Sequence, residues 1–370
     1  MRNMTPTAVS EYRIRSIDAL RGFDMLMIVF ADQFFSKLHE GAGSNFTEAL
    51  ALQFSHPQWF GFRFYDIIMP LFLFVVGAVI PFSLSKRMQS DTPKSSLFPK
   101  LLQRFLILFF LGWIVQGNLL DFDLSTFKIF SNTLQAIAVG YIFTSLAYLY
   151  LKPFHRYLLF VGCLMLYAIL LTLPVIPGIG RSTLAPDVNF ALYVDHLVFG
   201  SFDDGKQYTW LLTGLGFTAT TLSGLFAGER IKNSKDRTKV FKTLLLLGAV
   251  FVGTGILANP WHPVVKKIWS SSFVLVSSGI CYLLLAIFYW IIDVKQQYKW
   301  AFFLKIIGRN AITAYVITHV FPFPKIVDFV LYGLAPYTGK YYELITVIGG
   351  FGLLYLLLWY MYKNKTFIKV

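Results

Sequence analysis

Two residues of the types that carry out proton transfer occur near the start of the chain. Asp32 lies at the end of an apolar segment over residues 16–35, and His56 precedes a second apolar segment. A carboxylate fixes the tautomer of an imidazole and stabilises its charged form, which lets histidine take a proton from an amine or hydroxyl near neutral pH. Histidine can also accept an acyl group covalently. The alternative is an exposed histidine in an aromatic interfacial segment, because Trp59 and several phenylalanines follow it.

The first apolar segment is long enough to cross a membrane but contains four ionisable residues: Asp18, Arg21, Asp24 and Asp32. Each one at the centre of a transmembrane helix costs about 2.5–3.5 kcal/mol, so they need partners, water or a function. Asp18 and Arg21 are three residues apart and share a helix face, which favours a structural ion pair. The alternative is that Arg21 helps to hold an anionic ligand, together with the basic residues Arg104, Lys305 and Arg309 on the same side.

Composition indicates a polytopic membrane protein. Of the 370 residues, 56% are hydrophobic and 14% charged, with a mean hydropathy of +0.60, whereas soluble domains are about 25% charged. The net charge of +14 comes from short loops between apolar segments, so membrane topology explains it and nucleic-acid binding is not expected. Cys163 and Cys281 lie inside apolar runs and are expected to be packing residues, so we expect no metal site.

The apolar runs predict an all-α protein that forms a single transmembrane domain over residues 1–370. Ten helices are expected, at residues 16–35, 65–85, 99–117, 130–150, 154–173, 209–228, 240–258, 269–293, 301–320 and 342–362. Most lysines and arginines fall on one side of this arrangement, which predicts that both termini are cytoplasmic. The longest loop on the other side, 174–208, is expected to form a lid that begins with an ordered turn. Residues 321–335 fit a short re-entrant or interfacial helix.

Several later helices carry polar residues, for which hydrogen bonding between helices is the default interpretation. They include Asn132, Gln135, Ser272, Asn310 and Tyr315. His319 favours a functional role more strongly, because it ends its helix on the same side as His56. The sequence has no GxSxG, HExxH or Walker motif, so it gives no support for a serine hydrolase, a zincin or an ATPase.

Five stretches resemble a known family in order along the chain. They are RIRSIDALRGFDMLMIVFAD, HPQWFGFRFYDIIMPLFLFVVGAVIPFSLS, NTLQAIAVGYIF, KKIWSSSFVLVSSGICYLLLAIFYWIID and IGRNAITAYVITH. Together they are similar to the membrane domain of the heparan-α-glucosaminide N-acetyltransferases and their bacterial relatives. The combination of SIDALRG, His-x-x-Trp and an aspartate before a proline-containing apolar helix is specific to this family.

The resemblance implies transmembrane acetylation. Acetyl-CoA would be a co-substrate supplied from the cytoplasm, with no permanently bound cofactor, and an amino sugar or glycan hydroxyl on the far side would be the acceptor. The family's essential histidine corresponds to His56. Asp32 stands where the lysosomal enzyme has asparagine, and asparagine cannot take a proton at neutral pH. Further contacts to acetyl-CoA or acceptor are expected from Arg21, Asp66, Asn132, Gln135, Lys267, Trp269, Ser272, Asn310, Tyr315 and His319.

Two mechanisms stay open: His56 deprotonates an acceptor that attacks the thioester directly, or it carries an acetyl-imidazole intermediate. Two other functions are also compatible with the residues. One is a proton-coupled transporter of a sugar or organic anion, with the charges inside the membrane as its sites. The other is an inactive relative that only binds a partner or glycan. The resemblance favours an integral protein of the bacterial inner membrane and allows a homodimer.

Overall fold

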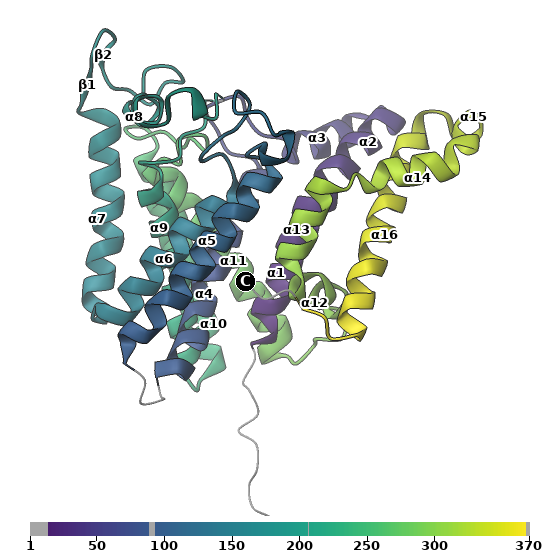
Figure 1. Cartoon of the computed structure of the whole chain (residues 1–370). Helices are drawn as coiled ribbons and strands as arrows, with labels where there is room; N and C mark the ends of the chain where they lie inside the picture. Colours follow the sequence, from purple (N-terminus) through teal and green to yellow (C-terminus); the bar gives the residue numbers. More distant parts are fainter. Residues whose placement is uncertain (1–13, 89–92, 206, 368–370) are drawn as a thin grey trace, which may run out of the picture.

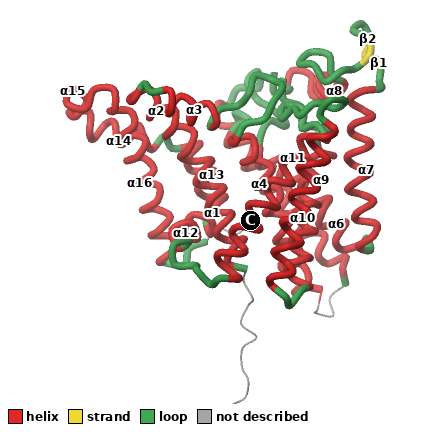
Figure 2. Tube along the Cα trace, turned by 180° about the vertical axis from the view of Figure 1, so that it is seen from behind, coloured by secondary structure: helices red, strands yellow, loops and turns green. Residues whose placement is uncertain are grey.

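The computed structural model describes residues 14–88, 93–205 and 207–367, and it confirms an all-α polytopic membrane protein (Figure 1). The regular structure of these residues is helical apart from a short antiparallel pair, β1 (Val175–Ile176) and β2 (Gly180–Arg181). The two chain ends that were expected to be cytoplasmic, residues 1–13 and 368–370, lie outside the described residues. Figure 2 shows that long loops gather at the end of the bundle that carries α8 (Phe190–Phe199).

The first helix is longer than the apolar run predicts. It consists of α1 (Arg15–Leu26), a π-helical segment (Met27–Ala31) and α2 (Asp32–Ala42), and it ends at Gly43, whose φ is 59°. A short helix, α3 (Asn45–Gln53), follows. Single π-helical turns often occur at functional sites. Here the π-helical segment ends immediately before Asp32.

Each of the ten predicted segments is largely helical. The helices are α4 (Ile68–Met88), α5 (Phe98–Val115), α6 (Thr133–Tyr150), α7 (Pro153–Thr172), α9 (Gly214–Asn233), α10 (Arg237–Ala258), α11 (Ser271–Tyr289), α12 (Phe302–Arg309), α13 (Ala311–Val320) and α16 (Tyr342–Lys363). The predicted ninth helix is two helices, because the backbone of Asn310 leaves helical geometry at ψ 33° between α12 and α13. Two further helices, α14 (Phe323–Leu331) and α15 (Ala335–Thr338), follow α13.

Seven helical segments among the described residues are long and apolar enough to cross a membrane. They are 64–85, 94–115, 133–150, 153–172, 237–258, 271–294 and 323–363. The segment that contains α1 is not one of them, in keeping with its buried charges Asp18 and Asp24. Neither α12 nor α13 is long enough by itself to cross a membrane. The count of ten spans therefore stays a prediction.

Glycines allow the central helices to approach closely. A Cβ at Gly77 of α4 would overlap the carbonyl oxygen of Thr221 in α9, and one at Gly224 would overlap the carbonyl oxygen of Phe74. Gly22 of α1 meets the carbonyl oxygen of Leu304 in α12 in the same way. Small residues at helix crossings are typical of membrane bundles, where close packing replaces the hydrophobic effect as the driving force.

The loop over 174–208 begins with β1 and β2, in which Val175 pairs with Arg181 and Ile176 with Gly180. The PVIPGIG stretch was expected to form a turn and no strand, so the structure differs here: the turn is closed by this two-residue ladder. Residues 323–331 form the amphipathic helix α14, which lies across the ends of α13 and α16 (Figures 1 and 2). A short helix was expected here, and its re-entrant or interfacial position in the membrane stays a prediction.

Candidate active site

His56 lines a cavity of about 460 Å³ at the end of the bundle where the long loops gather. We call it the histidine cavity. Its walls come from the π-helical segment, α2, α4, α6, α9 and α13, and from the loops before α9 and α11. Of the residues expected from the sequence, Asp32, Asn132, Lys267, Trp269, Tyr315 and His319 line it together with His56. Its volume suits a small-molecule or cofactor site.

Two loops hold His56 in place. The loop over 54–63 pairs with the loop before α11, through an antiparallel bridge between Phe60 and Val265 and a hydrogen bond of 3.3 Å from the Gly61 amide to the Val264 carbonyl. The guanidinium of Arg63 donates to the carbonyl oxygen of His56 at 3.1 Å. The backbone that carries His56 is therefore fixed at several points.

The carboxylate that contacts His56 is Asp66. Its Oδ1 lies 2.7 Å from His56 Nδ1, and its Oδ2 accepts a hydrogen bond of 2.9 Å from the Arg63 amide. Asp66 is fully buried, with 0% exposure. A carboxylate on Nδ1 fixes the tautomer that is protonated there, so Nε2 keeps its lone pair for chemistry.

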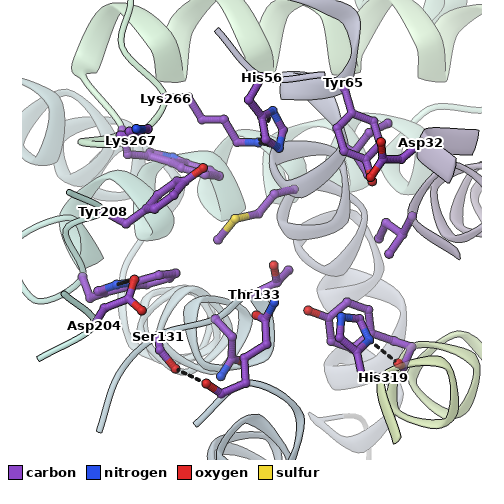
Figure 3. A pocket seen from close by; sticks show the side chains of 18 of the residues that line it. Asp32, His56, Tyr65, Ser131, Thr133, Asp204, Tyr208, Lys266, Lys267 and His319 are labelled. Atoms are coloured by element: carbon purple, nitrogen blue, oxygen red, sulfur yellow. Dashed lines mark hydrogen bonds between the residues drawn. The ribbon is translucent and has the colours of Figure 1, made fainter. Parts of the chain in front are cut away.

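Asp32 was expected to be this partner, and among the described residues no hydrogen bond links it to His56. Asp32 lies in the same cavity next to Tyr65 (Figure 3). Asp66 takes this place because it belongs to the 3-10 turn at 64–67. The loop over 54–63 folds back onto this turn and brings His56 to Asp66. Asp66 was expected from the sequence to contact substrate, whereas its contact here is with His56.

Lys266 is a functional candidate that the sequence reasoning missed. Its Nζ lies 2.9 Å from His56 Nε2, 3.1 Å from Nδ1 and 3.5 Å from Asp66 Oδ1. Burial lowers the pKa of Lys266 to about 8, although the charge of Asp66 acts in the opposite direction. Two adjacent lysines precede the tryptophan of the KKIW stretch, and only the second was selected. The pair of adjacent lysines could have identified Lys266, because two neighbouring lysines are unusual on the non-cytoplasmic side, where few basic residues are expected.

Lys267 contributes to a neighbouring wall. Its Nζ lies 5.7 Å from the ring centre of Trp59 and 5.8 Å from that of Tyr208, and 3.4 Å from the side-chain oxygen of Gln207. Trp269 has a φ of 48°, a left-handed conformation that is strained for a bulky residue. The turn that ends at Trp269 thus directs Lys266 and Lys267 to different partners.

The polar residues at the start of α6 stabilise the helix end. Asn132 accepts hydrogen bonds from the amides of Leu134 and Gln135, and its amide donates to the Gly112 carbonyl at 2.9 Å. Gln135 donates to the Ile129 carbonyl and is fully buried behind the cavity wall. Asn132 lines the cavity, whereas Gln135 supports it.

Three other predicted residues do not line the histidine cavity. The Ser272 hydroxyl donates to the Pro263 carbonyl at 2.9 Å and so stabilises the loop that carries Lys266. Asn310 is buried at the break between α12 and α13, and its side-chain amide has no hydrogen-bond partner within the described ranges. Arg21 lines a second cavity.

This second cavity, of about 440 Å³, contains three arginines: Arg21, Arg104 and Arg309. We call it the arginine cavity. Helices α4, α6 and α13 and the continuous helix that begins with α1 line both cavities at different heights. On that first helix, Asp32 is eleven positions after Arg21, which corresponds to about 16 Å along the axis. On α4 and α13 the nearest lining residues of the two cavities, Met69 and Phe72 and Tyr315 and Ile312, are only about one helical turn apart.

Comparisons with known proteins agree with the sequence resemblance. Residues 13–116 match a family described as "Domain of unknown function (DUF5009)". Heparan-alpha-glucosaminide N-acetyltransferase of Mus musculus is 25% identical, over 98% of this chain and 61% of its own length. The protein of the same name from Homo sapiens is 26% identical, over 84% of this chain and 53% of its own length. The chain thus spans between about half and three fifths of these relatives, and the expected distant relationship is confirmed.

Proposed function

We propose that this chain, a distant relative of the heparan-α-glucosaminide N-acetyltransferases, is a membrane acetyltransferase that moves an acetyl group from cytoplasmic acetyl-CoA to an acceptor on the other side. The observation that carries the proposal is the pairing of His56 with Asp66 in a cavity that shares its helices with a second cavity lined by three arginines. His56, paired with Asp66, provides a base or nucleophile. The arginine cavity provides positive charge for an anionic donor.

The arginine cavity suits the phosphate groups of acetyl-CoA. Guanidinium groups bind phosphate through directed, charge-assisted hydrogen bonds. With the phosphates near Arg21, Arg104 and Arg309, the extended pantetheine arm points along the first helix toward Asp32, over about 16 Å. The thioester then reaches the histidine cavity without passage of the whole coenzyme through the membrane.

His56 supplies the chemistry in either of the two mechanisms. With Nδ1 directed to Asp66, its Nε2 can take the proton of an acceptor amine or hydroxyl as it attacks the thioester. Nε2 can equally attack the thioester itself and carry the acetyl group. Asp66 stabilises the positive charge that the imidazole gains in both cases.

The acceptor is an amino sugar or a glycan hydroxyl. Trp210 lines the histidine cavity with its aromatic side chain, and Tyr208, Asp32 and Asp204 lie in the same cavity (Figure 3). Aromatic faces with a few polar groups are typical of small-molecule sites that fix orientation. A carboxylate also favours an acceptor with a cationic amino group.

Purified protein in liposomes tests the proposal. We expect acetyl-CoA-dependent release of CoA thiol in the presence of an amino sugar or glycan, with the acetylated product identified by mass spectrometry. His56→Ala should lower the rate by about 10²-fold or more, whereas His155→Ala, at an exposed position on α7, should not. Full activity of His56→Ala, or sugar uptake without acetyl-CoA turnover, would contradict the proposal and favour a transporter.

A second measurement separates the two mechanisms. Incubation with labelled acetyl-CoA and no acceptor labels the protein at His56 if the covalent route operates. Absence of label in an active preparation indicates direct transfer.

A further inference from the structure

We propose that Lys266 is a catalytic residue, whose ammonium group stabilises the negative charge that forms on the thioester carbonyl oxygen during acetyl transfer. This inference rests on the proposed function and assigns a new role within the same site. Lys266 was not among the residues expected from the sequence. Neither the family match nor the similarity to the relatives assigns it a function.

The first argument is distance. Lys266 Nζ lies 2.9 Å from His56 Nε2, and both residues line the histidine cavity. A carbonyl group that reacts beside Nε2 can direct its oxygen to a donor in this position at about 3 Å, the spacing required of a group that stabilises an oxyanion. Among the lysines that line this cavity, Lys266 alone contacts His56 in the described part of the chain.

The second argument is burial. Only 10% of the Lys266 side chain is exposed, and Asp66 is 3.5 Å away. A charge in such surroundings interacts more strongly with a developing oxyanion than it does in water, and it needs no reorganisation at the moment of reaction. Asp66 balances the ammonium before the substrate arrives, which explains how the buried lysine is tolerated.

The third argument concerns the resting state. Nζ of Lys266 lies 2.9 Å from Nε2 and 3.1 Å from Nδ1 of His56, so the ammonium rests over the imidazole ring and near the Asp66 carboxylate, outside the direction of the Nε2 lone pair. A thioester carbonyl offers Lys266 another acceptor. The carbonyl oxygen therefore meets an ammonium that is already in place, while Nε2 keeps its lone pair for the reaction.

The position of Lys266 is fixed by its neighbours. Val265 bridges to Phe60 in the loop that carries His56, and the Trp269 amide donates to the Lys266 carbonyl at 2.8 Å. The amide of Thr209 donates to the Lys267 carbonyl at 3.2 Å. The backbone of this turn is thus held from two sides, which suits a group that must be preorganised.

The reaction balances with these residues alone. In direct transfer, the acceptor nitrogen or oxygen bonds to the carbonyl carbon, its proton passes to His56 Nε2, and the carbonyl π electrons move to the oxygen beside Lys266. When these electrons return, the carbon–sulfur bond breaks, and CoA leaves as a thiolate that takes the proton from His56. In the covalent route Nε2 bonds to the carbonyl carbon, the carbon–sulfur bond breaks and CoA leaves as a thiolate. The acceptor then bonds to the same carbon, the bond to Nε2 breaks, and the acceptor's proton passes to the imidazole and from there to the thiolate. The carbonyl oxygen carries negative charge beside Lys266 in both steps.

The experiment compares wild-type protein with Lys266→Met in detergent, using acetyl-CoA and an acceptor that the wild type acetylates. We expect kcat to fall by about 10²–10³-fold, whereas the Kd of acetyl-CoA, measured by equilibrium dialysis, changes less than threefold. Lys325→Met, an exposed lysine on α14, is the control and should match the wild type. A kcat of Lys266→Met within threefold of the wild type would overturn the inference.

Chemical rescue guards against a purely structural effect of the substitution. Ethylammonium added to Lys266→Ala should restore the rate at least tenfold, because it replaces the missing cation, and it should have no effect on His56→Ala. A folded Lys266→Ala protein whose rate does not respond to any alkylammonium would overturn the inference. A wild-type protein that turns over no acetyl-CoA would instead contradict the proposed function, so the two failures are distinguishable.

Discussion

Asp66 Oδ1 lies 2.7 Å from Nδ1 of His56, and the carboxylate is fully buried while the imidazole reaches the cavity. This pair combines a fixed tautomer with an accessible second nitrogen. Asp32 faces the same cavity without a hydrogen bond to His56, so the two aspartates are expected to have separate roles. Asp66 orients the histidine, and Asp32 is available to the acceptor.

Substitution of the two aspartates by asparagine should separate these roles. Asp66→Asn removes the charge that stabilises the imidazolium, and it can hold the wrong tautomer, so kcat should fall by about 10²-fold or more with a small change in KM. Asp32→Asn should mainly raise the KM of the acceptor. Steady-state kinetics with varied acceptor measure both. Equal losses of kcat in the two variants would contradict the assignment.

The rate should fall as the pH rises through about 8. Burial lowers the pKa of Lys266 to about 8, so the ammonium is charged below this value and neutral above it. Lys266 faces His56 and Asp66, with Lys267 next to it in the chain and Tyr208 across the cavity. The pH profile of kcat/KM measures this decline. The alkaline decline should be absent from the residual activity of Lys266→Met.

Stability should change in the opposite direction over the same range. The folded pKa of Lys266 is below that of the unfolded chain, so between about pH 8 and 10.5 the unfolded chain binds more protons and the free energy of unfolding rises with pH. The rise is of order 3 kcal/mol, from about 1.4 kcal/mol per pKa unit. Thermal unfolding of wild type and Lys266→Met at pH 7.5 and 9.5 measures it, and the variant should show a smaller increase.

Close approach of α4 and α9 should make Gly77 intolerant of larger side chains. Gly77→Val places atoms on the carbonyl oxygen of Thr221, so the helices must separate and stability should fall by about 1–3 kcal/mol or more. Gly162→Ala on α7, where no atom lies within 4 Å of a Cβ, is the control. Unfolding temperatures in detergent compare the two. An unchanged unfolding temperature of Gly77→Val would show that the crossing of α4 and α9 does not determine the packing.

The helical framework could be predicted because apolar runs of about 20 residues have few alternatives in a bilayer. The break at Asn310 was not predicted. Gly308, Arg309 and Asn310 interrupt the apolar run there, but whether such residues end a helix depends on how α12 packs against α1. His56 could be selected from its residue type and neighbours. Its partners could not be identified in the same way, because they depend on how two loops far apart in sequence pair with each other.

The contact between Lys266 and His56 illustrates this limit. These residues are 210 positions apart, and the bridge between Phe60 and Val265 brings them together. No local pattern distinguishes Lys266 from Lys267, although they are neighbours in one turn. The side chain of Lys266 points to His56, whereas that of Lys267 points to Trp59 and Tyr208. Side-chain direction within an irregular turn is a tertiary property.

Substitutions in the arginine cavity should weaken binding of acetyl-CoA but not of a donor without phosphates. Arg104→Gln and Arg309→Gln each remove a guanidinium from this cavity, and a hydrogen bond to a charged group is worth about 1.5–3 kcal/mol. The Kd of acetyl-CoA should therefore rise by about 10–100-fold in each variant. With S-acetylpantetheine as donor, the same variants should match the wild type. Lys100→Gln, an exposed position one turn before Arg104 on α5, is the control for loss of a positive charge. Parallel losses with both donors would place the phosphates elsewhere, because the phosphates and the adenosine are the parts of acetyl-CoA that S-acetylpantetheine lacks.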